Sequence, residues 1–182
     1  MDRNIEAKLT AALKNGDFRE PLKQHHRDIM LDLVLAWGSL DGALTQLVSA
    51  LKGTPLHEEA ERIGKANGST KLTEIVRLLR SIDGAENAAR KFRKHKKDYE
   101  KYSNARNRIA HGHCSGYLAS DERYVVFLVA EHYGDGDMAI EAISIEEMIL
   151  ATTFGKALTI LILSICGKIY TVRGDDVGST EE

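Results

Sequence analysis

The 182-residue sequence contains little that would stop a helix or cross-link a fold. It has two prolines, and because proline is the strongest helix breaker, long helices are expected. Its two cysteines, Cys114 and Cys166, are too few for a disulfide framework or a four-cysteine zinc site. Lys and Arg (25) nearly balance Asp and Glu (27), and the net charge of −2 argues against coating duplex DNA by bulk charge.

The residues that are present favour a globular protein with its own core. Hydrophobic residues make up 43% of the chain and charged residues 29%, which is unlike a disordered sequence. The charged, amphipathic first residues lack the apolar core of a signal peptide, so we expect a cytoplasmic protein. With no internal repeat or interior linker, we predict a single, mainly α-helical domain over residues 1–171 and a disordered polar tail over residues 172–182.

Apolar residues recur at steps of three and four in several segments, which is the spacing of one helix face. The first segment, 20–52, ends at Gly53 and Pro55, and further helices are expected over 56–66, from Ser69 or Thr70 onwards, and over 85–111. Ser144 opens a Ser-x-x-Glu capping box for a last, almost entirely apolar helix that ends near Tyr170. Its uncharged run of 11 residues, 157–167, is shorter than the roughly 20 residues of a membrane span, so a bundle or partner contact is expected.

Two segments before that last helix favour β-structure. Tyr124–Ala130 is rich in β-branched and aromatic residues, and Met138–Ser144 could pair with it. Between them, Tyr133–Asp137 is rich in turn residues. The predicted fold is therefore all-α in the main, a helical bundle with a small β-hairpin insert at about 117–144.

The segment Arg106-Asn107-Arg108-Ile109-Ala110-His111-Gly112 holds the side chains that metal-free RNA cleavage needs. A histidine, with a pKa of about 6.5, can take the proton of a ribose 2′-hydroxyl. An arginine presents a planar, permanently charged fork to phosphate oxygens. Asn107 and His111 share a helix face, whereas Arg106 lies roughly 140° around an ideal helix from His111. Either the helix ends near Gly112, or residues of two chains meet.

This segment resembles the motif of the HEPN superfamily (higher eukaryotes and prokaryotes nucleotide-binding). Its ribonuclease members carry Arg, a polar residue and His, with four to six residues between the Arg and the His. Arg106, Asn107 and His111 fit this pattern with four residues between, and Ala110-His111-Gly112 is typical of bacterial members. Trp37-Gly38-Ser39-Leu40-Asp41 also resembles a recurrent family segment. The resemblance implies an all-α bundle, a homodimer whose two motifs face one cleft, and products with a 2′,3′-cyclic phosphate.

A second feature of the predicted 85–111 helix is a basic cluster, Arg90–Lys97, with six Lys and Arg in eight positions. Such a cluster can follow an RNA backbone, although charge runs are usually solvated helix faces. The residues predicted to bind RNA are Arg90, Lys91, Arg93, Lys94, Lys97, Arg108 and His113.

Other interpretations of the motif remain open. A cationic side chain at a helix C-terminus capped by Gly112 is ordinary helix chemistry. Arg108 and His113 have the same spacing as Arg106 and His111 and form an alternative register. His111, His113 and Cys114 lack a second cluster that would complete a metal site, so no metal or cofactor is expected.

The sequence thus predicts a metal-independent endoribonuclease whose catalytic residues are Arg106, Asn107 and His111, acting as a toxin or phage-defence effector. The expected partners are RNA, a second copy of the chain and an antitoxin or regulatory protein, with no membrane. Some HEPN toxins carry a tyrosine two residues after the motif histidine that an antitoxin modifies; His113 stands there, and Tyr117 follows. The alternative is a non-catalytic helical interaction or dimerisation module of the same fold.

Overall fold

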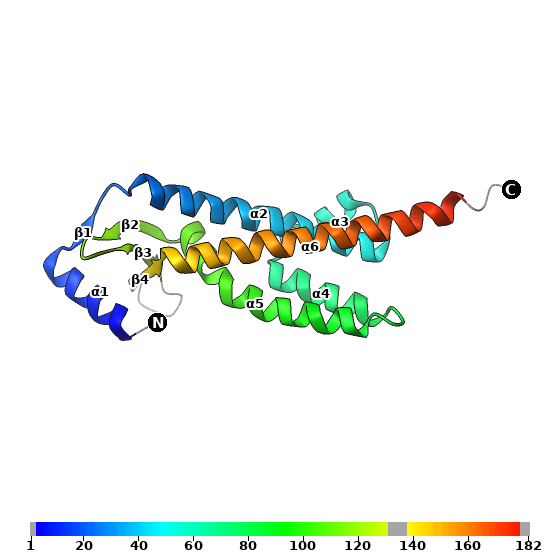
Figure 1. Cartoon of the computed structure of the whole chain (residues 1–182), viewed down its shortest axis with the longest axis horizontal. Helices are drawn as coiled ribbons and strands as arrows, with labels where there is room; N and C mark the ends of the chain where they lie inside the picture. Colours follow the sequence, from blue (N-terminus) through cyan, green and yellow to red (C-terminus); the bar gives the residue numbers. More distant parts are fainter. Residues whose placement is uncertain (1–2, 131–137, 179–182) are drawn as a thin grey trace. The chain divides into compact units, whose positions relative to one another are not determined.

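The computed structural model describes residues 3–130 and 138–178, and within these ranges the chain is mainly helical (Figure 1). Helix accounts for 72% and strand for 15%, which confirms a helical fold with a small β insert before the last helix. The elements are α1 (Arg3–Asn15), β1 (Phe18–Arg19), α2 (Gln24–Lys52), α3 (Leu56–Ile63), α4 (Gly68–Arg80), α5 (Glu86–His111), β2 (His113–Leu118), β3 (Asp121–Ala130), β4 (Met138–Ser144) and α6 (Ile145–Gly178).

Contacts within the chain form two compact units. The first, which we call the sheet unit, comprises residues 1–35 and 102–153; the second, the helical unit, comprises residues 36–101 and 154–182. Each of the helices α2, α5 and α6 contributes residues to both units. The single domain over residues 1–171 stays a prediction.

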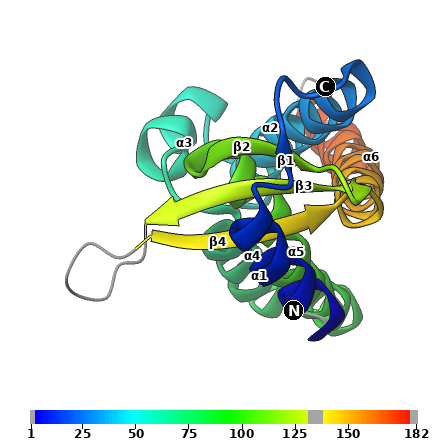
Figure 2. The ribbon, with the colours of Figure 1, turned by 90° about the vertical axis from the view of Figure 1, so that its left-hand side faces the viewer.

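The sheet has four antiparallel strands in the order β1-β2-β3-β4 (Figure 2). The predicted hairpin is its β3–β4 pair, which runs from Tyr124 opposite Ser144 to Ala130 opposite Met138. The predicted turn, Tyr133–Asp137, lies in the segment 131–137, outside the described residues. The expectation of a two-stranded insert starting near residue 117 is wrong, because β2 begins at His113 and β1 pairs with it. Neither strand has a clear alternating pattern: β1 is two residues long, and β2 contains a glycine and small polar residues.

Helix α1 covers one face of this sheet (Figure 2). Its buried Leu9 and Ala12 pack against Leu118 of β2 and Val126 of β3. The neighbouring residues Val125 and Phe127 are also fully buried, and because side chains alternate along a strand they lie on the opposite face. The central strand β3 is therefore buried on both faces, which explains its unbroken apolar run.

The helical unit is organised around the single tryptophan. The Trp37 ring lies 4.8 Å from the Tyr99 ring and 6.3 Å from the Phe154 ring, measured between centroids, and 4% of Trp37 is exposed. Gly68 lies so close to Tyr99 that an added Cβ would come within 2.5 Å of its ring. The helix α4 begins at this glycine and is capped by Asn67, whose Oδ1 accepts from Thr70 N at 2.8 Å. The expected caps, Ser69 and Thr70, are therefore wrong by two or three positions.

Two charged side chains are buried in the helical unit. Lys71 of α4 is fully buried, and its Nζ donates to Asp41 Oδ2 at 2.8 Å and to the Gly64 carbonyl oxygen at 3.1 Å. Glu59 of α3 is 3% exposed and forms ion pairs with Lys52 and Arg62. Burying a charge is costly unless it is paired and hydrogen-bonded, so these contacts fix how α2, α3 and α4 pack.

The ends of two long helices differ from expectation. Helix α2 begins at Gln24 rather than Glu20. Helix α6 continues to Gly178, past the expected end near Tyr170, so the prediction of a disordered tail is wrong for 172–178. No proline follows Tyr170 to end the helix. The remaining tail residues, 179–182, lie outside the described residues.

Two helices are long and apolar enough to cross a membrane, judged by length and composition alone: Gln24–Lys52 and Ile145–Val172. The core helices of soluble proteins pass the same test. The most apolar window of 18 residues in Gln24–Lys52 is 61% buried, and the corresponding window in Ile145–Val172 is 33% buried. This is weak evidence for a membrane location, and the cytoplasmic location stays a prediction.

The pair Lys71–Asp41 gives a stability prediction. Replacing Asp41 by Asn leaves the buried ammonium group without its charged partner, and we expect a loss of about 2 kcal/mol in the free energy of unfolding. Lys71→Met in the Asp41→Asn background should recover much of that loss, because an apolar side chain of similar length needs no partner. Urea unfolding measures both variants, with the exposed Asp83→Asn as the control. Equal stability of wild type and Asp41→Asn would contradict this role.

Candidate functional site

The three predicted catalytic residues lie in the last two turns of α5. Asn107 and His111 are exposed, and Arg106 is partly buried. The guanidinium Nη1 of Arg106 donates to Asn107 Oδ1 at 3.2 Å. Because Asn107 and His111 are four residues apart on a continuous helix, they share one solvent-facing side. Asn107 thus contacts the Arg106 guanidinium and shares an exposed side of the helix with the His111 imidazole.

A tight turn at Gly112 ends the helix directly after His111. The Gly112 N–H donates to the Arg108 carbonyl oxygen at 2.7 Å. A Cβ at this position would come within 2.6 Å of that oxygen and 3.3 Å of Phe127 Cβ, so a larger residue would not fit without a shift. The chain then enters β2 at His113. His111 is thus the last residue of α5, as the sequence predicted.

Arg108, the arginine of the alternative register, is held by the sheet. Its guanidinium makes two hydrogen bonds to the Glu141 carboxylate, one from Nη2 to Oε1 at 2.6 Å. Glu141 on β4 lies opposite Phe127 on β3, which lies opposite Cys114 on β2. The ion pair therefore spans from the end of α5 across the strands that follow it. The Arg108 side chain, which the sequence predicts to bind RNA, is thus already paired with Glu141. We therefore favour Arg106 and His111, rather than Arg108 and His113, as the motif pair.

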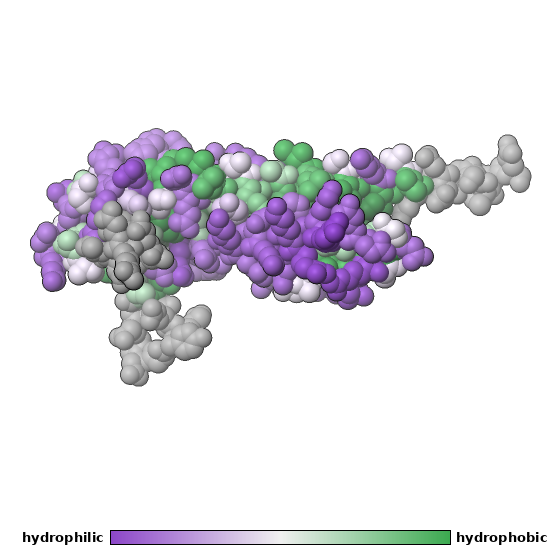
Figure 3. Space-filling model, turned by 60° about the horizontal axis from the view of Figure 1, so that its bottom comes forward, coloured by the Kyte–Doolittle hydropathy of each residue, from purple (hydrophilic) through white to green (hydrophobic). Residues whose placement is uncertain are grey.

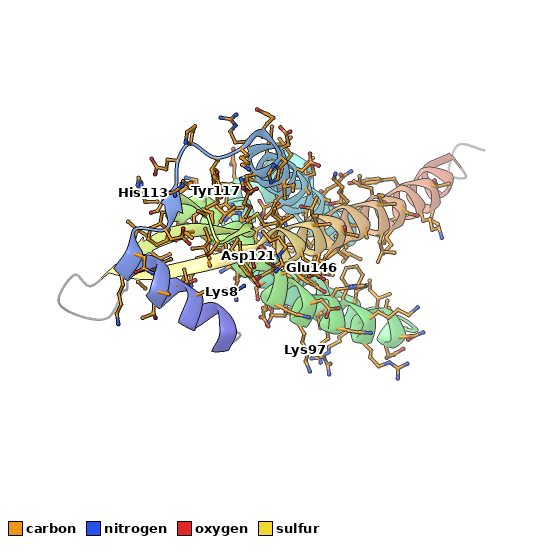
Figure 4. The ribbon with its side chains drawn as sticks, turned by 60° about the vertical axis from the view of Figure 1, so that its left-hand side comes forward. Lys8, Lys97, His113, Tyr117, Asp121 and Glu146 are labelled. Atoms are coloured by element: carbon orange, nitrogen blue, oxygen red, sulfur yellow. The ribbon has the colours of Figure 1, made fainter. Side chains whose placement is uncertain are left out.

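His113 and Cys114 open strand β2. His113 is exposed and lies opposite Leu128, and Figure 4 shows it on the sheet. Cys114 is partly buried, and burial raises the pKa of its thiol, which disfavours the reactive thiolate. Within residues 3–130 and 138–178, no three His, Cys, Asp or Glu side chains are grouped to hold a metal ion.

The predicted basic cluster forms an exposed face of α5 in the helical unit. Its exposed members are Arg90, Lys91, Arg93, Lys94 and Lys97. Phe92 is buried between them, and Lys96 is partly buried beside Glu100, 3.4 Å away. Figure 4 shows Lys97 projecting outward from α5, and Figure 3 shows a hydrophilic surface over this part of the molecule. Steps of three and four place most of these cations along one side of the helix.

Asp41 ends the segment Trp37–Asp41, which resembles a recurrent family segment. In the structure its carboxylate pairs with buried Lys71 in the helical unit, whereas the motif residues belong to the sheet unit. The two partners differ in exposure: the Lys71 side chain is fully buried, whereas the Asp41 side chain is 47% exposed. The contact gives Asp41 a packing role.

A surface pocket of about 320 Å³, which no pattern in the sequence predicts, lies where β3 and α6 begin. Its lining is mostly apolar and consists of Arg123, Tyr124, Ser144, Ile145, Glu146, Ile149 and Leu150. The Ser144 Oγ accepts from Glu147 N at 3.0 Å, which confirms Ser144 as the N-cap of α6. The pocket lining includes none of the predicted catalytic residues.

Comparison of the chain with protein families, with curated proteins and with solved structures found no match. The site therefore has to be interpreted from its own geometry.

The Arg108–Glu141 pair predicts a specific stability loss. Because each side chain is about one-third exposed, replacing either by Gln should cost about 1 kcal/mol of unfolding free energy. The two losses should not add in the double variant, since one interaction is removed in each case. A double-mutant cycle by urea unfolding measures this coupling. Lys23→Gln, which breaks a more exposed pair with Glu122, is the control and should cost less.

Proposed function

We propose that this protein is a metal-independent endoribonuclease of HEPN type. The observation that carries the proposal is the end of α5, where Asn107 and His111 are exposed on one side and Arg106 donates to Asn107. A base, a cation and an orienting amide thus lie within the last six residues of α5, with the base and the amide exposed. These are the types of side chain that cleavage of RNA by its own 2′-hydroxyl needs.

In the proposed reaction, His111 removes the proton of the ribose 2′-hydroxyl. The 2′-oxygen then attacks the adjacent phosphorus, and the bond from phosphorus to the 5′-oxygen breaks. The leaving 5′-oxygen takes a proton from solvent, and His111 returns its own proton to solvent, so the products are a 2′,3′-cyclic phosphate and a 5′-hydroxyl. Arg106 stabilises the charge that builds up on the phosphate oxygens, and Asn107 orients the guanidinium.

A homodimer is part of the proposal because one copy of the motif is incomplete. Arg106 and His111 are separated by roughly 140° around the helix, so they do not converge on one phosphate. A second copy that places its own α5 end opposite would supply the missing group from across the cleft. Exposed large apolar side chains on α6 offer a surface for such a contact: Ile149, Leu150, Ile160, Leu161, Leu163, Tyr170 and Val172.

The basic face of α5 would guide the RNA backbone. Five exposed cations in eight residues stand out in a chain whose net charge is −2. Lys and Arg side chains bind phosphates without regard to base sequence, which suits an enzyme that recognises RNA by its phosphate backbone. A toxin or phage-defence role, with an antitoxin or other regulatory partner, is the biological setting we propose for this activity.

The same apolar surface supports one alternative. Ile160 is 70% exposed on α6, an unusual position for a large aliphatic side chain. A non-catalytic interaction module would use this helix to bind a partner and would need no reactive His111. The cleavage assay below separates the two functions.

The deciding experiment is RNA cleavage in excess EDTA by wild type, His111→Ala and Arg106→Ala. Loss of the general base should lower the rate at least about 100-fold. Arg106→Ala should lower it comparably, because the transition-state charge is left without its cation. Products are identified by their 2′,3′-cyclic phosphate ends.

His57→Ala, at an exposed histidine of α3, is the matched control and should retain wild-type activity. His113→Ala and Arg108→Gln test the alternative register. Sedimentation velocity on the same samples reports whether the active species is a dimer. No cleavage of diverse RNAs by folded wild-type dimer would refute the nuclease and leave the interaction module.

The basic face gives a separate binding prediction. Replacing Arg93 and Lys97 by Gln should weaken single-stranded RNA binding and flatten its salt dependence by roughly 1.4 in the slope of log K against log salt, about 0.7 for each lost phosphate contact. Fluorescence anisotropy at several salt concentrations measures both. The control is Lys65→Gln with Arg80→Gln, which removes the same charge from exposed positions outside this face. An unchanged slope in the Arg93/Lys97 variant would exclude these residues from the RNA contact.

A further inference from the structure

His26, near the start of α2, is a buried histidine that the proposed reaction does not use. It is 1% exposed. Its Nε2 lies 2.8 Å from the Glu122 carbonyl oxygen at the start of β3, and its ring centroid lies 5.0 Å from that of Tyr117 on β2. One side chain thus joins the beginning of α2 to two strands of the sheet.

The contacts of His26 define its protonation state. A carbonyl oxygen can only accept, so Nε2 carries the proton in this hydrogen bond. The other ring nitrogen, Nδ1, is buried and has no hydrogen-bond partner among the described residues. In the neutral ring, Nδ1 carries a lone pair and no proton, so its burial leaves no N–H donor without an acceptor. In the protonated ring it would be a second N–H donor with no acceptor and would bring a charge into the interior.

The surrounding charges do not compensate a protonated ring. Lys23 precedes it on the connection into α2, and the His25 ring centroid lies 4.0 Å from its own. The Glu122 carboxylate, which would attract a protonated ring, is already bound by Lys23 Nζ at 2.6 and 2.7 Å. Tyr117 contributes a neutral ring, over which Lys23 Nζ lies at 5.6 Å. Burial is the largest effect that lowers the pKa of His26; Lys23 and His25 add to it, and Glu122 opposes it.

We propose that His26 is a pH-sensitive latch: when neutral it holds the start of α2 on strands β2 and β3, and when protonated it releases that segment. The segment it secures includes β1, the edge strand, whose two residues pair with Tyr117 and Leu118. Such a short strand contributes few hydrogen bonds of its own, so its attachment depends on neighbouring contacts. This inference does not rest on the proposed nuclease activity.

The direction of the pH effect follows from linkage. The pKa of His26 is lower in the folded protein than the value of about 6.5 in an unfolded chain, so the folded state binds fewer protons. The stabilising contribution is complete above that value and is lost as the pH falls below it. In this pH range, protonation of one group changes the equilibrium between the attached and the released start of α2 by up to about tenfold per pH unit.

The test compares wild type, His26→Gln and His25→Gln at pH 7.5 and 5.5. Hydrogen exchange of peptides covering residues 18–26 and 113–122, corrected for the intrinsic rate, measures local opening. Wild type should open several-fold more at pH 5.5. His25→Gln, which alters the exposed neighbour, should behave alike, and His26→Gln should show no such increase because its amide does not titrate in this range.

A second measurement needs no variant to fold. In a wild-type NMR titration, the His26 ring should stay neutral to a lower pH than the usual value of about 6.5. Its protonation should coincide with the loss of protection in residues 18–26. A His26 pKa at or above about 6.5 would overturn the latch. An equal pH dependence of hydrogen exchange in wild type and His26→Gln would also overturn it.

Discussion

The turn at Gly112 is the constraint on which the candidate site depends. An added Cβ at this position would come within 2.6 Å of the Arg108 carbonyl oxygen and 3.3 Å of Phe127 Cβ, so a larger residue does not fit without a shift. The helix ends at His111, and the chain enters β2 at His113. Near the same junction, Arg108 pairs with Glu141, which lies opposite Phe127 on β3. The exposed His111 is thus carried by a helix end that is joined directly to the sheet.

On a continuous helix, Arg106 and His111 lie roughly 140° apart, which places them on different sides of α5. The proposed activity therefore calls for a second copy of the chain, and the exposed apolar side chains of α6 offer a surface on which two copies could pack. Catalysis and association would then depend on each other, since a monomer would hold half a site.

The sequence predicted those features that local patterns encode. Periodic apolar residues predict α2 to within four residues, and the apolar run of 124–130 predicts β3 because that strand is buried on both faces. Ser144 was recognised as a cap because its partner is three residues away. Strands β1 and β2 were missed because their stability comes from pairing with distant segments, not from their own composition.

The long-range polar contacts were missed for the same reason. Lys71 and Asp41 are 30 residues apart, Arg108 and Glu141 are 33 apart, and His26 and Glu122 are 96 apart. In the sequence each of these residues is indistinguishable from a solvated surface residue. Their roles come from partners that only the packed fold brings together. The segment 106–112 is visible in the sequence as a pattern, whereas the pairing of its Arg108 with Glu141 is not.

The distribution of charge limits how RNA would reach the site. A net charge of −2 produces no attraction at long range, and beyond a Debye length of about 10 Å at 0.1 M salt the basic face of α5 is screened. Encounter with RNA would therefore gain little from electrostatic steering. Once the backbone lies against the helix, however, each neutralised phosphate releases counterions and strengthens binding. An enzyme built in this way would engage RNA mainly where RNA is already concentrated, and its affinity, rather than its association rate, would respond most strongly to salt.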